Sequence, residues 1–163
     1  MDLRRVREVR FWDKVRRSVN KIAALCEAAD GDGHPSIERV VAIATAGPRP
    51  VEVRNARLPW GVFGRWLRYP DKDVFEVADG LPSRDWTIAH ELGHLVLGHG
   101  KLFSEIGSTA SLRSEPSTVM SRSCGAASHE RCELEAERFA ALLLDRLRVI
   151  ADLSASGTQE LLG

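Results

Sequence analysis

The sequence predicts a small α+β domain, and three observations support this. The chain opens with one long amphipathic helix from Leu3 to about Ala29, in which apolar residues recur at helical spacing. Strand-like segments at 51–53, 62–69 and 74–77 predict an antiparallel or mixed sheet of about three strands. Two apolar helices, around residues 84–97 and 133–144, then pack beside that sheet.

Length and charge set the domain organisation. A chain of 163 residues is most naturally one domain, spanning 1–163, with a substantial core. Within it we expect the helix at 1–30, a long Ser-rich loop at 103–130 and a frayed tail at 154–163. The 23 basic and 23 acidic residues give zero formal charge, so direct nucleic-acid binding is not expected.

The composition also bears on the compartment. No apolar run is long enough to cross a bilayer, so no membrane association is expected. The basic start of the chain is not followed by a signal-type apolar region. The three cysteines, Cys26, Cys124 and Cys132, are an odd number and suit a reducing environment. The sequence therefore predicts a cytoplasmic protein.

The most informative motif is His90-Glu91-Leu92-Gly93-His94. Successive helical residues are about 100° apart, so His90 and His94 lie about 40° apart on one face. Two neutral imidazoles at this spacing can bind one Zn²⁺. Glu91 lies on the flank of that face, where it can reach a metal-bound water rather than the metal. The motif predicts a hydrolytic site with His90 and His94 as ligands and Glu91 as general base.

The apolar residues around the motif predict a largely buried helix. Ser83 or Asp85 can cap its start, and Gly98 and Gly100 fit its end. The alternative is a surface turn with two solvated histidines. A buried helix argues against that alternative, because polar groups buried without partners are costly.

The residues after the motif exclude one kind of third ligand. The third histidine of a metzincin would fall at Gly100. His99 is one residue early and about 140° from His94 on a continuing helix. We therefore expect His99 to be a helix-end histidine that points away from the metal.

The next apolar helix is the best source of the third ligand, since a catalytic zinc site has three protein ligands and a water. Glu135 is the preferred candidate for the third ligand. Ala136 beside it would allow the two helices to approach closely, and Phe139 one turn later would form one wall of the site. Glu133 and Glu137 lie about 200° from Glu135 and are expected to face elsewhere. The alternative is that all three are ordinary acids on a solvated first turn.

At this point a family resemblance becomes specific. His-Glu-Leu-Gly-His, followed about forty residues later by Glu-x-Glu-Ala-Glu-x-Phe-Ala-x-Leu-Leu, resembles the ImmA/IrrE family of metallopeptidases. The stretch 61–66 is similar to short actinobacterial members, and the likeness runs from about Ser36 to Leu144. Two positions depart from the family pattern: Glu137 replaces Asn or Asp, and Leu144-Asp145 replaces Met-Pro.

The resemblance implies a small gluzincin-like, and hence zincin-like, fold with one Zn²⁺. His90, His94 and Glu135 would be its ligands and Glu91 the catalytic base. It also implies a zinc endopeptidase whose partner is a protein substrate, commonly a helix-turn-helix repressor that binds DNA.

Two other functions remain open at this stage. One is a non-catalytic regulatory module that keeps the fold, and with it a metal or a partner-binding surface. The presence of Glu91 argues against this, because a structural site does not need that carboxylate and is usually closed by four protein ligands. The other is a DNA-associated regulator that uses the arginine-rich first helix, although a solvated face explains those arginines as well.

The segment 103–130 connects the two predicted ligand helices, so it is expected to lie near the metal. One hypothesis is that Cys124 or His129 caps the open coordination position and keeps the enzyme latent. No aromatic of the strand region is assigned a role, since core packing explains those residues equally well.

Overall fold

The computed structural model describes residues 3–30, 35–102, 104–105, 118–121 and 127–160. Its helices and strands, in chain order, are α1 (Leu3–Asp30), α2 (Ile37–Ala44), β1 (Val51–Ala56), β2 (Gly64–Arg68), β3 (Asp73–Ala78), α3 (Arg84–Val96), the 3-10 helix η1 (His99–Leu102), β4 (Ser104–Glu105), β5 (Thr118–Ser121) and α4 (Ala127–Glu160). The α+β class predicted from the sequence is confirmed.

The sheet has the strand order β1-β3-β2-β5-β4. β1 pairs with β3 in parallel, and the other neighbours are antiparallel. The predicted three strands form one side of this mixed sheet. The short strands β4 and β5 arise within the segment expected to be a loop throughout. Strands of two and four residues are too short to show a periodicity in the sequence.

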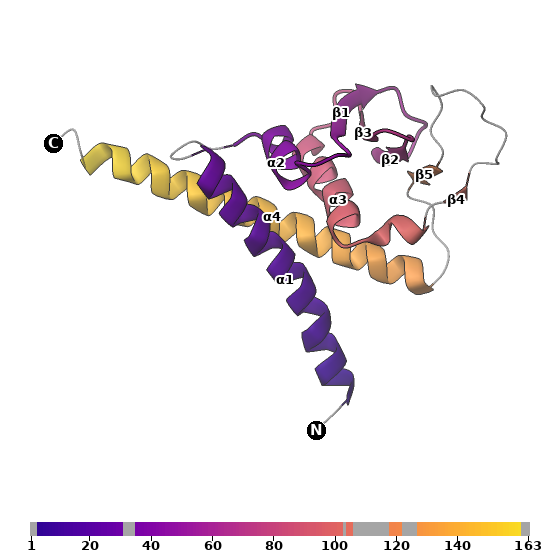
Figure 1. Ribbon diagram of the computed structural model, residues 1–163, viewed down its shortest axis with the longest axis horizontal. Helices are drawn as coiled ribbons and strands as arrows, with labels where there is room; N and C mark the ends of the chain where they lie inside the picture. The colour runs from indigo at the N-terminus through magenta and orange to yellow at the C-terminus, as the bar shows by residue number, and fades with distance from the viewer. Residues whose placement is uncertain (1–2, 31–34, 103, 106–117, 122–126, 161–163) are drawn as a thin grey trace.

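α3 lies at the centre of the molecule, between the sheet and the other helices (Figure 1). α3 packs against β2 and β3 on one side and against α2 and α4 on the other. α1 packs across α4, and its N-terminal end extends away from the rest of the chain. α4 continues as a helix through Glu160. The frayed tail at 154–163 stays a prediction.

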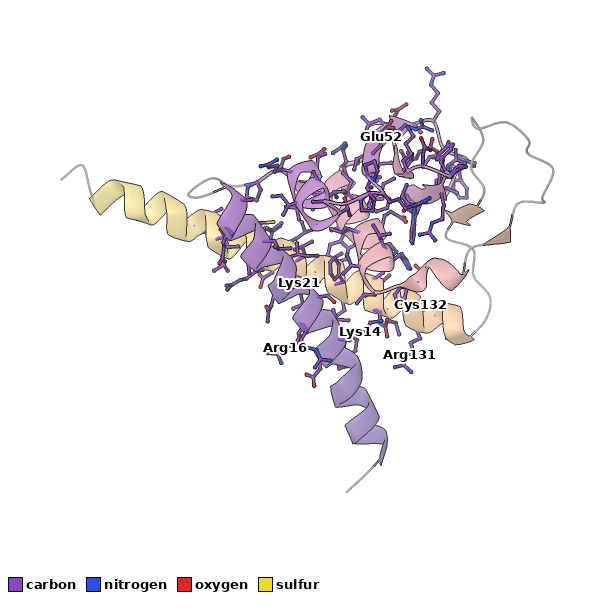
Figure 2. The ribbon with its side chains drawn as sticks, viewed as in Figure 1. Lys14, Arg16, Lys21, Glu52, Arg131 and Cys132 are labelled. Carbon is purple, nitrogen blue, oxygen red and sulfur yellow. The ribbon has the colours of Figure 1, made fainter. Side chains whose placement is uncertain are left out.

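The core draws on all four α-helices and the central strands. Ile88 and Leu92 of α3 and Phe139 of α4 are fully buried, and burying such a side chain stabilises the fold by about 1.5–3 kcal/mol. α1 has one buried and one exposed face over residues 12–29, where its side chains are described. Its apolar stripe includes Val15, Val19 and Ile22. Basic residues lie outside that stripe, as Figure 2 shows for Lys14, Arg16 and Lys21. No described helix combines the length and apolar content needed to cross a membrane.

A buried carboxylate ties three strands together. Glu76 of β3 is 4% exposed and pairs in register with Arg54 of β1 and Arg65 of β2. Its two carboxylate oxygens accept hydrogen bonds from these guanidinium groups, the Arg54 Nη2 distance being 2.6 Å. Burial raises the pKa of Glu76, but the hydrogen bonds from the two arginines lower the pKa by more than burial raises it. The pKa of Glu76 is therefore below its usual value. Glu76 is therefore ionised at neutral pH.

Replacing Glu76 with Gln should lower the free energy of unfolding by about 1–3 kcal/mol at pH 7, because two arginines lose a buried anionic partner. Since the pKa of Glu76 is lowered on folding, its stabilisation is present above pH 4.5 and is lost as the pH falls further. Urea unfolding at pH 7 and at acid pH measures both effects.

Glu52 of β1 provides the matched control. Its partner Lys72 lies 2.6 Å away, and both side chains are more than one-third exposed. Glu52→Gln should change stability by less than about 1 kcal/mol. Equal losses for Glu52→Gln and Glu76→Gln would contradict a special role for the buried carboxylate.

Candidate metal centre

α3 places both motif histidines on one buried face. His90 and His94 are each 1% exposed, and their Nε2 atoms lie 3.0 Å apart. The helix begins at Arg84 with Asp85 in its first turn, where a carboxylate interacts favourably with the helix dipole. Ser83 precedes it without a side-chain capping bond. The predicted pairing of the two imidazoles is therefore present in the fold.

The acidic residue that meets these histidines is Glu133, and this differs from the expectation for Glu135. Glu133 Oε2 lies 3.3 Å from His90 Nε2, and Glu133 Oε1 lies 3.2 Å from His94 Nε2. Among the described residues, the possible ligand atoms of these three side chains all lie within 4.8 Å of one another. Glu135 contacts His99 instead, at 2.7 Å. Glu137 is exposed, as expected.

The electrostatics of the three side chains fit a divalent cation. Burial lowers the pKa of His94 to about 4, so its imidazole is neutral at pH 7. Burial raises the pKa of Glu133, but hydrogen bonds with His90 and His94 lower it more, to well below its usual range. Neutral imidazole nitrogens and an ionised carboxylate are the forms that bind metals. Their possible ligand atoms lie within 4.8 Å of one another, close enough for one cation to contact all three.

Glu91 lies in the same buried region, with 4% of its surface exposed. The backbone of β2 comes very close to it at Gly64. A Cβ atom added at Gly64 would lie 3.2 Å from Glu91 Oε1 and only 2.4 Å from Cγ2 of Thr87. Glycine at this position therefore leaves room for the Glu91 carboxylate between α3 and the sheet.

Gly93, in the middle of the motif, sets the distance between α3 and α4. A Cβ atom there would lie 3.0 Å from Cδ1 of Phe139 and 3.2 Å from Cα of Ala136. The two helices thus approach closely at Ala136, as the sequence suggested. This contact also fixes the rotation of α4 that directs Glu133 toward the histidines.

Replacing Gly93 with Ala should push α4 away from α3, because backbone atoms of Ala136 cannot move aside as a flexible side chain would. Overpacking of this kind costs about 1–3 kcal/mol. We expect lower stability and weaker metal binding together. Thermal unfolding and chelator competition measure the two effects.

Gly47→Ala is the control, since the nearest atom to its added Cβ would be 4.0 Å away. It should leave both measurements unchanged. A Gly93→Ala protein with normal metal affinity would show that helix spacing does not govern the cluster.

His99 is placed by the end of α3. Gly98 adopts a φ of +76°, a left-handed conformation that glycine favours and that ends helices. The chain turns there, and His99 folds back to put its Nδ1 atom 3.0 Å from Nδ1 of His94. His99 is outside the three-residue group, on the side of His94 opposite Nε2, but it is 5% exposed and packed within the structure.

The sequence analysis did not assign Glu133 to the cluster. It expected His99 at the helix end and away from the metal, and the structure places it after α3 and outside the three-residue group. The contact between His99 and Nδ1 of His94 was not foreseen. The available signal for His99 was Gly98, the usual residue for ending a helix. The hypothesis that Cys124 or His129 caps the open coordination position stays a prediction. Cys124 and the side chain of His129 lie outside the described part of the structure.

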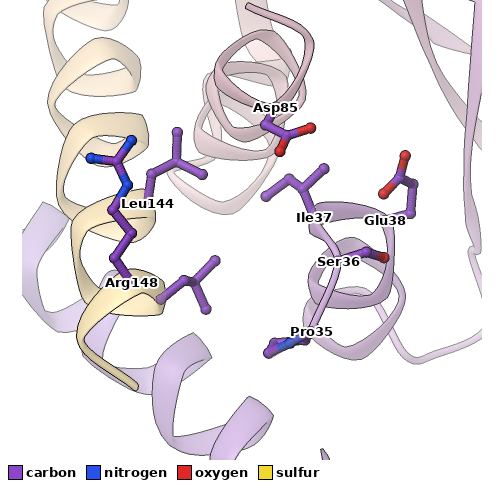
Figure 3. A pocket seen from close by; sticks show the side chains of 8 residues that line it. Pro35, Ser36, Ile37, Glu38, Asp85, Leu144 and Arg148 are labelled. Atoms are coloured by element: carbon purple, nitrogen blue, oxygen red, sulfur yellow. The ribbon is translucent and has the colours of Figure 1, made fainter. Parts of the chain in front are cut away.

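A separate pocket of about 220 Å³ lies near the start of α3 (Figure 3). Asp85 of α3, Ile37 of α2, and Leu144 and Arg148 of α4 contribute to its walls. None of the cluster residues lines it. It belongs to the opposite end of α3 from His94, so it is distinct from the metal centre.

The α+β architecture, with its buried histidines on a helix beside a mixed sheet, defines a zincin-like domain. The chain belongs to the ImmA/IrrE family: the family model described as IrrE N-terminal-like domain (Peptidase_M78) matches residues 77–160, just over half of its length. The matched segment contains the motif helix and Glu133, and it identifies a metallopeptidase-type domain. No curated protein sequence matches the chain.

Proposed function

We propose that this protein is a zinc-dependent endopeptidase that hydrolyses a peptide bond in a regulatory protein. The observation that supports the proposal best is the convergence of His90, His94 and Glu133 from two helices in a buried site. Two imidazoles and one carboxylate are a donor set found in catalytic zinc sites, where a fourth position stays open. Glu133 takes the place proposed from the sequence for Glu135.

Each residue of the site has a defined role in this proposal. His90, His94 and Glu133 hold the ion. When bound, zinc supplies a Lewis acid that lowers the pKa of water and polarises the scissile carbonyl. Glu91 accepts a proton from the water whose oxygen bonds to the carbonyl carbon. Glu91 then delivers that proton to the amine nitrogen as the carbon–nitrogen bond breaks.

The substrate we propose is a helix-turn-helix repressor, encountered in the cytoplasm. The family assignment supports a protein substrate. The small, odd number of cysteines in the chain is compatible with a reducing compartment. In this scheme, cleavage of the repressor, rather than contact between the protease and DNA, changes gene expression.

Incubating zinc-loaded protein with a helix-turn-helix regulator encoded beside it tests the proposal. Mass spectrometry should detect two fragments whose masses sum to that of the regulator plus one water. The fragments should be absent with chelator and return after zinc is added back. A zinc-loaded protein that binds the regulator tightly and leaves it intact would favour the non-catalytic regulatory module.

A further inference from the structure

A chain of hydrogen-bonding groups extends away from the metal centre behind His94. His94 Nδ1 lies 3.0 Å from Nδ1 of His99, and His99 Nε2 lies 2.7 Å from Oε2 of Glu135. All three side chains are at least nine-tenths buried. This series of hydrogen bonds thus links the end of α3, the turn that follows it and α4.

Only one arrangement of protons satisfies the chain when His94 binds a metal through Nε2. The neutral His94 ring then carries its proton on Nδ1, which donates to Nδ1 of His99. His99 must accept at that nitrogen, so its own proton is on Nε2. That proton is donated to Glu135, a carboxylate that only accepts. Each group therefore fixes the tautomer of the one before it.

We propose that His99 and Glu135 are positioning residues that hold His94 in its metal-binding tautomer and orientation. The inference rests on the proposed zinc function, because it assigns these residues to a zinc ligand. Metal-bound histidines usually donate their second ring proton to a carboxylate or carbonyl acceptor. In this protein the acceptor is a second imidazole, and the carboxylate lies one group further away.

The local fold keeps this chain in place. The left-handed Gly98 sets the turn that returns His99 to α3. Lys14 of α1 donates a hydrogen bond of 2.6 Å to the Leu97 carbonyl oxygen, which holds the end of α3 just before that turn. Arg131, one helical turn before Glu135, lies 3.7 Å from its other carboxylate oxygen. The Glu135 carboxylate, which is the last acceptor in this series of hydrogen bonds, thus also has a basic side chain beside it.

Substitution of Glu135 tests the inference. Glu135→Leu removes the acceptor and should weaken zinc binding by about 10–100-fold, the usual effect of losing such an outer partner. Glu135→Gln keeps an oxygen that can accept from His99 and should restore affinity to within a few-fold of the wild type. Glu137→Leu, at an exposed position two residues away, is the matched control and should bind zinc normally.

Zinc affinity is measured by chelator competition on full-length protein that is folded by circular dichroism. The visible spectrum of the cobalt-substituted protein should change with Glu135→Leu and stay unchanged with Glu137→Leu. A purely structural role for Glu135 predicts lower stability but an unaltered cobalt spectrum and zinc affinity. That result would overturn the inference.

A measurement on the unmutated protein keeps the inference testable if Glu135→Leu does not fold. Nitrogen-15 NMR of the zinc-loaded protein should show the proton of His94 on Nδ1 and the proton of His99 on Nε2. A His99 proton on Nδ1 would overturn the inference. If zinc binds and the tautomers are as stated, yet no regulator is cleaved, the positioning role stands and the proposed peptidase function fails.

Discussion

Glu91→Gln should bind zinc as well as the wild type and lose peptide hydrolysis. The substitution preserves the shape of a side chain that is 4% exposed, so the fold and the ligands should be undisturbed. A neutral amide cannot accept the proton that the attacking water must lose. General acid–base catalysis of this kind contributes about 10²–10⁴-fold to the rate, and we expect a fall in kcat of at least that size.

Metal analysis and cleavage kinetics must be made on the same preparation to test this expectation. Glu137→Gln, on the exposed face of α4, is the control and should retain both zinc and activity. If Glu91→Gln holds one zinc per chain and still cleaves at the wild-type rate, Glu91 is not the general base. If it loses zinc, the carboxylate has a role in the ligand set.

Glu133→Ala should abolish tight zinc binding. The change removes the only carboxylate of the described three-residue group, leaving two imidazoles to hold the ion. Losing an outer partner alone weakens metal affinity by about 10–100-fold, so loss of a direct ligand should exceed that range. Because bound metal stabilises the native state, the zinc-dependent rise in Tm should also disappear.

The comparison with Glu135→Ala decides between the two glutamates. Glu135→Ala should weaken zinc binding less than Glu133→Ala, because Glu135 contacts His99 rather than the metal-facing nitrogens. The opposite order would restore Glu135 as the third ligand. Titration of zinc against a competing chelator, with each variant and with Glu137→Ala as control, gives the ranking directly.

Local periodicity was sufficient to predict much of the fold and two of the three residues of the candidate metal centre. His90 and His94 are four residues apart on one helix, so their shared face follows from helical geometry alone. The three main strands were predictable for a similar reason, since their residues alternate or are β-branched. Such features depend only on residues that are neighbours in the sequence.

The third acidic residue could not be predicted in this way. Which side of α4 faces α3 depends on how tightly the helices pack at Gly93, Ala136 and Phe139. A choice between Glu133 and Glu135 requires that rotation, and the sequence of one helix does not contain it. The placement of His99 likewise depends on a backbone reversal at Gly98 that a continuing helix would not have.

The segment matched by the family model begins at residue 77, yet α3 is packed by residues that come earlier in the chain. Val15, Val40 and Trp66 belong to the same apolar cluster as Ile88 and Leu92. A truncated protein limited to residues 77–160 would lack these upstream residues, so the apolar side chains of α3 would be exposed to water and prone to aggregation. The smallest part of the chain that folds by itself is therefore expected to extend well upstream of the matched segment and to include the buried part of α1.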